Sequence, residues 1–125
     1  MLAHNILVAE DDDDFAKFLG DLLQTAGYRY VIFKDGLAAH RAFKDGGFDL
    51  AILDLALPNF SGVEVLRFAK HKNRKIPILV LTGHDTPETR ALVKDAGGAS
   101  FLDKKATPET ILKELAALAK RSANE

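Results

Sequence analysis

The stretch Asp49–Gly62, DLAILDLALPNFSG, carries the clearest indication of how this chain folds. Its first part, Leu50–Leu53, is apolar at every position rather than at alternate ones, which is typical of a strand buried on both faces of a parallel sheet. Asp54 follows directly, and Pro58 and Ser61 mark a loop and the start of a helix. The stretch therefore predicts a buried strand that brings one carboxylate to the edge of a sheet.

Four further apolar runs of this kind occur along the chain, and amphipathic segments separate them. Thr86–Glu88 and Thr107–Glu109, both TPE, combine a capping hydroxyl, a proline at the first helical position and an acid in the first turn. Ser61 and Glu64 have the spacing of a capping box, and Gly27 suits a helix C-terminus. Five alternating β–α units predict an α/β fold, a doubly wound parallel sheet. The other runs are Ile6–Ala9, Tyr30–Phe33, Ile76–Leu81 and Ser100–Leu102.

Composition predicts one globular domain over residues 1–125, because 47% of the residues are hydrophobic and 28% are charged. A net charge of −1 argues against a nucleic-acid surface built on bulk charge, and the absence of cysteine excludes thiolate metal sites. No signal peptide and no run long enough to span a membrane is evident, so we expect a cytoplasmic location. We expect residues 122–125 to be a frayed tail. Met1 and a complete last helix slightly favour an independent protein over an excised piece.

Polar residues close the apolar runs, at the strand ends where open α/β sheets bind ligands. Glu10 and Asp11 follow the first run and Asp54 the third. Thr82 follows the fourth run, and Lys104 comes just after the fifth. Clustered carboxylates repel unless a cation joins them, and an oxygen-only ligand set favours Mg²⁺. A lysine and a hydroxyl beside the metal complete a phosphate site, in which a carboxylate can be the nucleophile.

An acid after a strand is more often a helix cap or a turn residue than a ligand. We assign that simpler role to Asp12–Asp14, which are placed to cap the first helix and to complement its dipole. The role suits Asp54 less well, because Leu55–Pro58 separates it from the next cap at Ser61. Asp54 is therefore the leading candidate for a reactive carboxylate.

In this arrangement the chain resembles the receiver domain of two-component response regulators, from Ile6 to about Arg121. Each motif alone is weak, but five in order at the right strand ends are specific. The matching residues are the acid pair Glu10 and Asp11 in ILVAEDD, the phosphorylated aspartate Asp54 with Pro58 and Gly62 after it, the hydroxyl Thr82 in ILVLTGHD, and the switch aromatic Phe101 and lysine Lys104 in GGASFLDKK.

The resemblance implies a flavodoxin-like fold with three α/β/α layers, five helices and the strand order 2-1-3-4-5. It implies that Asp54 accepts a phosphoryl group from a histidine kinase or a phosphotransfer protein, so that the chain is a signalling domain that supports its own phosphoryl transfer and autodephosphorylation. It also implies a Mg²⁺ ion bound by Asp11, Asp54 and the main-chain carbonyl of Ala56, with Glu10 acting through water.

The resemblance further implies a switch. Lys104 would pair with the phosphoryl oxygens, Thr82 would move towards them, and Phe101 would turn inward. The motion would alter the face made by the fourth helix, fifth strand and fifth helix, where a target protein would bind. We expect a monomer or a phosphorylation-dependent dimer, with no direct contact to nucleic acid and no insertion into a membrane.

Several residues depart from the pattern of the family. Lys105 replaces the usual proline, and a cis bond costs about 2.5–4 kcal/mol before a non-proline residue against about 0.5–1 kcal/mol before proline. We therefore expect a Lys104–Lys105 bond that is trans, or cis only under strain, and Lys105 is a minor alternative for the lysine role. Glu10 replaces an aspartate, which a water-mediated ligand tolerates. Ala56 and His84 flank the water path to the phosphoryl group and should influence its lifetime in a direction that the sequence does not fix; His84 is equally an exposed loop residue.

Three alternatives remain open from the sequence. A phosphatase or phosphotransferase of the haloacid-dehalogenase type also phosphorylates an aspartate, but it carries a second acid two residues later, where this chain has Ala56. A flavodoxin-like FMN binder would need a phosphate loop after the first strand, and the acids there would repel the phosphate. A degenerate receiver that acts only by docking is the third, although the acids, Thr82 and a lysine are retained.

Overall fold

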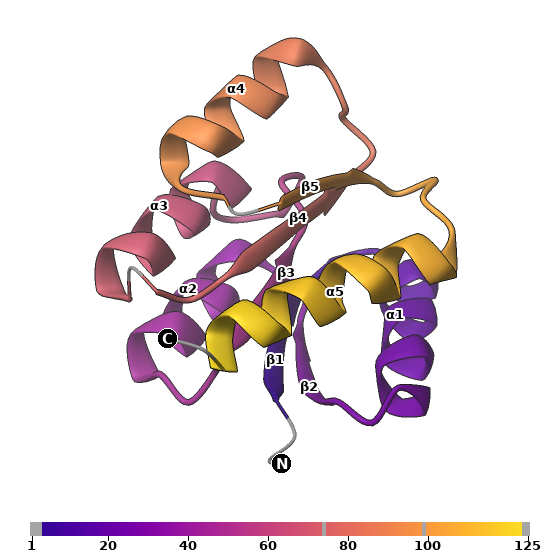
Figure 1. The fold of residues 1–125 in the computed structure, drawn as a ribbon. Coiled ribbons are helices and arrows are strands. Elements are labelled where there is room, and N and C mark those ends of the chain that lie inside the picture. Colours follow the sequence, from indigo (N-terminus) through magenta and orange to yellow (C-terminus); the bar gives the residue numbers. More distant parts are fainter. Residues whose placement is uncertain (1–3, 74, 99, 124–125) are drawn as a thin grey trace.

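Residues 4–73, 75–98 and 100–123 are described by the computed structural model. Five parallel strands form one sheet in the order β2-β1-β3-β4-β5, and a helix follows each strand along the chain (Figure 1). The predicted doubly wound sheet and its strand order are confirmed. The strands are β1 (Asn5–Ala9), β2 (Arg29–Phe33), β3 (Leu50–Leu53), β4 (Ile78–Thr82) and β5 (Ser100–Asp103), and the helices are α1 (Asp13–Thr25), α2 (Gly36–Asp45), α3 (Gly62–Lys72), α4 (Pro87–Ala96) and α5 (Pro108–Ala123).

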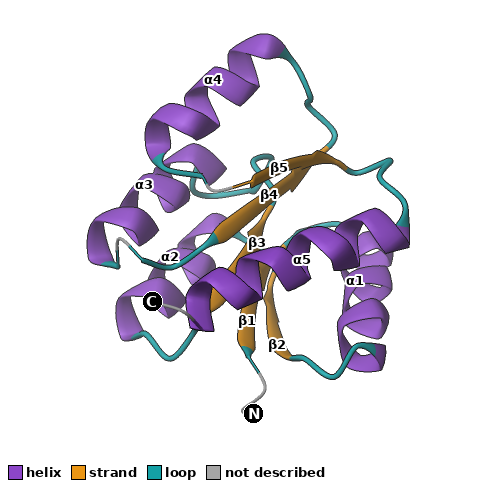
Figure 2. Cartoon of the chain, in the orientation of Figure 1, coloured by secondary structure: helices purple, strands orange, loops and turns teal. Residues whose placement is uncertain are grey.

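The helices form the outer layers of an α/β/α sandwich, with α1 and α5 on one face of the sheet and α2, α3 and α4 on the other (Figure 2). Each face has its own core. On the first, Leu19 and Leu23 of α1 meet Ile111 and Leu115 of α5 over inward-facing strand residues. On the second, small and aliphatic residues of the other three helices pack on the alternate strand residues. The sheet is therefore covered on both faces, as its fully apolar strands predict.

The central strands are far more buried than the edge strands. β1, β3 and β4 are buried along almost their whole length, whereas β2 and β5 are half-exposed. The apolar run predicted to begin at Ile76 enters the sheet only at Ile78. Pro77 comes before it and has no N–H to donate, although its carbonyl accepts a hydrogen bond from Ala51.

Helix caps set where the helices begin, and most follow the prediction. Asp12 accepts from the Phe15 N–H, and Thr86 accepts from the Thr89 N–H. The capping box predicted for Ser61 is wrong, because the Ser61 side chain makes no capping hydrogen bond and Glu64 lies 3.6 Å from Arg67 instead. The first turn of α3 is tied to the preceding loop by the Gly62 N–H, which donates to the Leu55 carbonyl.

Helix α5 continues to Ala123, and residues 124–125 of the expected tail lie outside the described part of the chain. Within the described residues, the apolar stretches of the helices are all too short to cross a membrane.

Candidate functional site

Strand register brings the predicted site residues to one edge of the sheet. Ala9 pairs with Leu53, and Thr82 pairs with Asp103 in the neighbouring pair of strands. The residues that follow β1 and β3 therefore emerge side by side, and those that follow β5 emerge at the same edge of the sheet, beyond β4. The Asp54 N–H donates to the Ala9 carbonyl, and the Lys104 N–H donates to the Thr82 carbonyl, so the main chain itself joins these strand ends.

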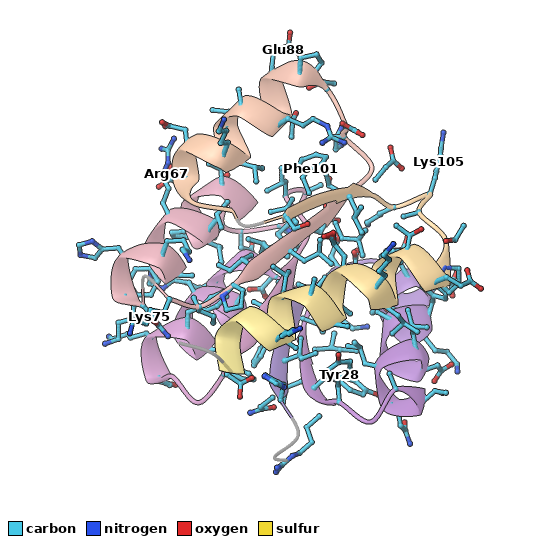
Figure 3. The ribbon with its side chains drawn as sticks, viewed as in Figure 1. Tyr28, Arg67, Lys75, Glu88, Phe101 and Lys105 are labelled. Atoms are coloured by element: carbon cyan, nitrogen blue, oxygen red, sulfur yellow. The ribbon has the colours of Figure 1, made fainter. Side chains whose placement is uncertain are left out.

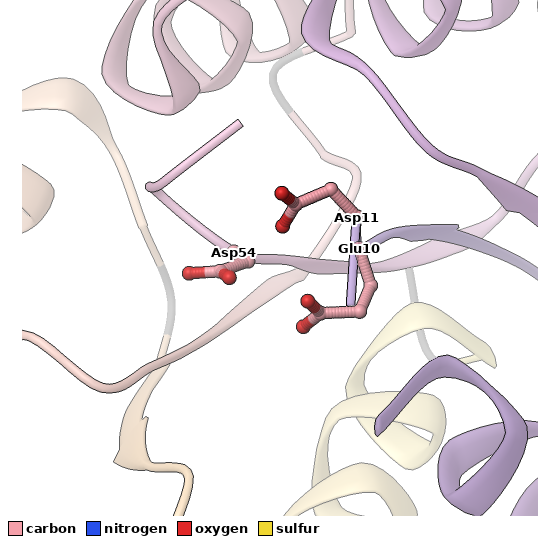
Figure 4. A group of neighbouring side chains, drawn as sticks. All are labelled: Glu10, Asp11 and Asp54. Atoms are coloured by element: carbon pink, nitrogen blue, oxygen red, sulfur yellow. The ribbon is translucent and has the colours of Figure 1, made fainter. Parts of the chain in front are cut away.

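Three carboxylates gather at this edge: Glu10 and Asp11 after β1, and Asp54 after β3 (Figure 4). One oxygen from each lies within 4.8 Å of the others. Glu10 and Asp54 are almost fully buried, whereas Asp11 is exposed, so the group opens to solvent on one side. An oxygen-only donor set with one open side suits a hard divalent cation such as Mg²⁺, which keeps several waters. We call Glu10, Asp11 and Asp54 the acid triad.

Lys104 lies between two members of the acid triad. Its Nζ is 2.8 Å from Asp54 Oδ2 and 2.9 Å from Glu10 Oε1. No cis peptide bond occurs in the described part of the chain, so the Lys104–Lys105 bond is trans. Lys105 is exposed, and Figure 3 shows its side chain pointing away from the molecule. The structure thus brings Lys104, and not Lys105, to Asp54.

Burial and charge act differently on the two partners of this ion pair. Burial raises the pKa of Glu10, and the hydrogen bonds from Lys104 and from the Asp12 N–H offset this only in part. For Lys104, burial opposes the charged form, but the hydrogen bonds to Asp54 and Glu10 and the attraction of their charges together outweigh it, so the pKa of the ammonium is raised. Lys104 therefore stays protonated, and its positive charge is held beside the Asp54 carboxylate.

Thr82 and the loop after it occupy the next strand end. Thr82 is fully buried, and its hydroxyl accepts a hydrogen bond from the His84 N–H at 3.3 Å. His84 itself is exposed. The hydroxyl is therefore held by the loop that leads into α4.

Phe101 of β5 lies under α4, half-buried (Figure 3). The Arg90 guanidinium of α4 stands over its ring, 4.5 Å from the centroid. The same guanidinium forms two hydrogen bonds to Asp85, at 2.6 and 2.9 Å. These contacts connect β5, α4 and the loop after Thr82.

The loop between β3 and α3 carries Ala56, whose N–H donates to Asp54 Oδ1 at 3.3 Å. Two glycines allow their own backbone segments to pack closely against this loop. A Cβ at Gly62 would lie 2.4 Å from Leu55 Cα, and one at Gly36 would lie 2.0 Å from the Phe60 carbonyl oxygen. These positions need glycine because the backbone of the loop occupies the space of a side chain.

Two neighbours of the site, Phe15 and Arg90, are not evident from the sequence. The ring of Phe15 on α1 lies 4.8 Å from Lys104 Nζ. In the sequence, Phe15 only begins the buried stripe of the first helix, and helical periodicity does not distinguish a core residue from one that faces a site. The role of Arg90 is not evident either, because its partners Asp85 and Phe101 lie outside its own helix.

Most of the chain matches a known protein family. Residues 6–116 match the model of the response regulator receiver domain. The chain belongs to this family. The resemblance seen in the sequence is therefore confirmed, and the haloacid-dehalogenase and FMN-binding alternatives are set aside.

Relatives of this receiver domain include sensor kinases and regulators. The chain is 33% identical over 115 residues to the CAI-1 autoinducer sensor kinase/phosphatase CqsS of Vibrio cholerae, a match that covers 90% of this chain and 17% of that protein. It is 37% identical over 108 residues to the swarming motility regulation protein RssB of Serratia marcescens, covering 86% of this chain and 49% of that protein. The chain spans about half or less of the curated relatives that it matches first.

The fold agrees with solved receiver domains. A CheY-like receiver domain from Methanospirillum hungatei superposes with a TM-score of 0.92 at 22% identity, over 99% of this chain and all of that one. The receiver domain of the sensor histidine kinase PA1611 from Pseudomonas aeruginosa, solved with a magnesium ion coordinated in its active-site cleft, superposes with a TM-score of 0.86 at 24% identity. That match covers 94% of this chain and 98% of the other.

Proposed function

We propose that this receiver domain accepts a phosphoryl group on Asp54 and acts as a phosphorylation-dependent signalling module. The observation that carries the proposal is the burial of the Asp54 side chain, which is 3% exposed, beside the Lys104 ammonium 2.8 Å away. A carboxylate can act as a nucleophile towards phosphorus. A fixed cation beside it neutralises the charge of the transferred group without reorganising solvent.

In the transfer, an Asp54 oxygen forms a bond to the phosphorus of the donor. The bond between phosphorus and the donor breaks, and the donor keeps its electron pair. The proposed donor is a phosphohistidine on a histidine kinase or a phosphotransfer protein. Lys104 pairs with the phosphoryl oxygens, and the Thr82 hydroxyl moves to donate a hydrogen bond to one of them. The same residues support autodephosphorylation, whose rate Ala56 and His84 influence from the loops beside the site.

The proposed cofactor is Mg²⁺, which the acid triad and the main-chain carbonyl of Ala56 would hold, with Glu10 acting through water. The donor chemistry supports this, because three carboxylate oxygens within 4.8 Å of one another are ligands for a hard cation. When bound, the ion supplies further positive charge for the phosphoryl oxygens. The magnesium in the cleft of the PA1611 receiver domain is consistent with the assignment.

The proposed output is a change in the face made by α4, β5 and α5. Movement of Thr82 towards the phosphoryl group pulls on the loop before α4, and Phe101 turns inward into the space behind it. The Arg90–Phe101 contact supports this coupling, because it joins α4 to β5. A target protein then binds the face, or two copies dimerise there on phosphorylation, with no direct contact to nucleic acid. The module acts in the cytoplasm.

Incubation with Mg²⁺ and acetyl phosphate, followed by intact mass, tests the proposal. We expect the native chain to gain one phosphoryl group, the Asp54→Asn variant to gain none, and a chelator to abolish the reaction. A folded native chain that gains no phosphoryl group with this donor or with phosphohistidine would instead be a degenerate receiver. An unchanged gain in the variant would place the acceptor elsewhere.

A further inference from the structure

Lys104 contacts an aromatic ring as well as two carboxylates. Its Nζ lies 4.8 Å from the centroid of the Phe15 ring, within the range at which an ammonium is attracted to an aromatic face. The lysine comes from the loop after β5, and the ring comes from the first turn of α1. Phe15 is half-buried and packs on the core shared by α1 and α5, so its ring is a fixed surface rather than a free side chain.

The position of the Phe15 ring is linked to the acid triad by a series of contacts that begins and ends at Glu10. Glu10 Oε2 accepts a hydrogen bond from the Asp12 N–H at 3.0 Å. Asp12 Oδ1 in turn accepts from the Phe15 N–H at 3.0 Å, as the cap of α1. The Phe15 ring contacts Lys104 Nζ, and that atom donates back to Glu10 Oε2 at 3.0 Å. The helix start that carries the ring is thus fixed to the carboxylate that holds the lysine.

We infer that Phe15 is a positioning residue for phosphoryl transfer, because its ring holds the Lys104 ammonium at Asp54. The inference rests on the proposed function and extends it to α1. Two of the three partners of the ammonium are carboxylates that a metal ion would also bind. The ring binds no Mg²⁺, whose ligands are oxygens. Its hold on the ammonium therefore persists when the charge of Glu10 and Asp54 is shared with an ion.

The ammonium itself gives the first readout. In metal-free protein labelled with ¹⁵N-lysine, NMR measures how fast the Nζ protons exchange with water. We expect the Lys104 protons to exchange more slowly than those of the exposed Lys105. Phe15→Leu keeps an apolar side chain but has no aromatic face, so it should speed exchange at Lys104 by about two- to tenfold. Phe15→Trp restores an aromatic face and should bring exchange back towards the native rate.

The rate of phosphorylation by acetyl phosphate gives the second readout, because a small donor does not dock on α1. We expect Phe15→Leu to slow the reaction by about two- to tenfold and Phe15→Trp to recover most of the loss. Phe18→Leu is the matched control. Phe18 lies on the same helix, its ring is 5.5 Å from that of Phe15, and it is 36% exposed. This variant should react at the native rate.

The outcomes separate the inference from the proposed function. If Phe15→Leu leaves both readouts at native values, or if Phe18→Leu changes them as much, the ring does not position the lysine and the inference is overturned. A Trp variant no better than the Leu variant would also overturn it, since the effect would then come from packing. If neither the native chain nor any variant is phosphorylated, the proposed function fails. The proton-exchange rate at Lys104 Nζ then still decides whether Phe15 positions the lysine.

Discussion

Replacing Lys104 by methionine should destabilise the metal-free protein, because it leaves two buried carboxylates without their cation. Asp54 is 3% exposed and Glu10 is 2% exposed, and Lys104 Nζ lies 2.8–2.9 Å from both. At an effective dielectric constant of about 20, unit charges at this separation attract by roughly 6 kcal/mol. Desolvation of the three groups offsets most of this, and removing one partner of a fully buried pair costs about 3–5 kcal/mol.

The site is not fully closed, so the cost should be smaller than that limit. The Lys104 side chain is 24% exposed and Asp11 is open to solvent, so water can reach the carboxylates. We therefore expect Lys104→Met to lower the free energy of unfolding by about 1–3 kcal/mol at neutral pH. The loss should shrink as the pH falls, because Glu10, whose pKa is already raised, then takes up a proton in the folded state. Added Mg²⁺ should recover part of it.

Urea unfolding at several pH values, with a chelator or with Mg²⁺, measures these effects. Lys105→Met is the control, because it removes the same charge from an exposed neighbour and should change stability by less than about 0.5 kcal/mol. If Lys104→Met unfolds at the same urea concentration as Lys105→Met, the reasoning about the buried carboxylates is refuted. A loss that grows towards acid pH would refute it equally.

Three further predictions concern the loops, the caps and pH. Gly62→Ala should lower the free energy of unfolding in urea by about 1–3 kcal/mol, because the added Cβ would lie 2.4 Å from Leu55 Cα. Gly83→Ala is the control and should be nearly neutral, because a Cβ there meets nothing within 4 Å. Equal losses of stability in the two variants would contradict this prediction. Thr86→Ala removes the side-chain cap of α4 and should cost about 1 kcal/mol, an effect that an unchanged unfolding midpoint would disprove. The pKa of Lys104 is raised in the folded state, so on the alkaline side the stability that it contributes should be present in full up to the ordinary lysine pKa and be lost as the pH rises through the folded value. Native and Lys104→Met chains should converge in stability there, and a constant difference at alkaline pH would count against the ion pair.

Much of the fold was predictable because several local signals agree. The fully apolar run Leu50–Leu53 is short and is followed by turn residues, which favours a buried strand over a helix. The TPE sequences indicated two helix starts whose caps the structure confirms. The capping box at Ser61 failed for a non-local reason. Close packing of Gly62 on the preceding loop fixes the start of α3, so the local pattern does not form.

The meeting of the three acids was predictable from the sequence, but the contacts made by the residues around them were not. Parallel strands end at one edge, so Glu10, Asp11 and Asp54 had to meet there. The direction of Lys104 was not predictable, because it depends on how the loop after β5 approaches α1. The contact with Phe15 follows from that approach, and only the structure reveals it.

If Asp54 carries the phosphoryl group, chemical mapping of the modified residue should locate it at that side chain. After reaction with acetyl phosphate and Mg²⁺, borohydride reduces an acyl phosphate to an alcohol and so marks the modified side chain permanently. Peptide mass mapping should then find the reduced side chain at position 54, in proportion to the phosphorylation measured before reduction. Its appearance at position 11, or an unmodified position 54 in a chain that has gained a phosphoryl group, would contradict the account.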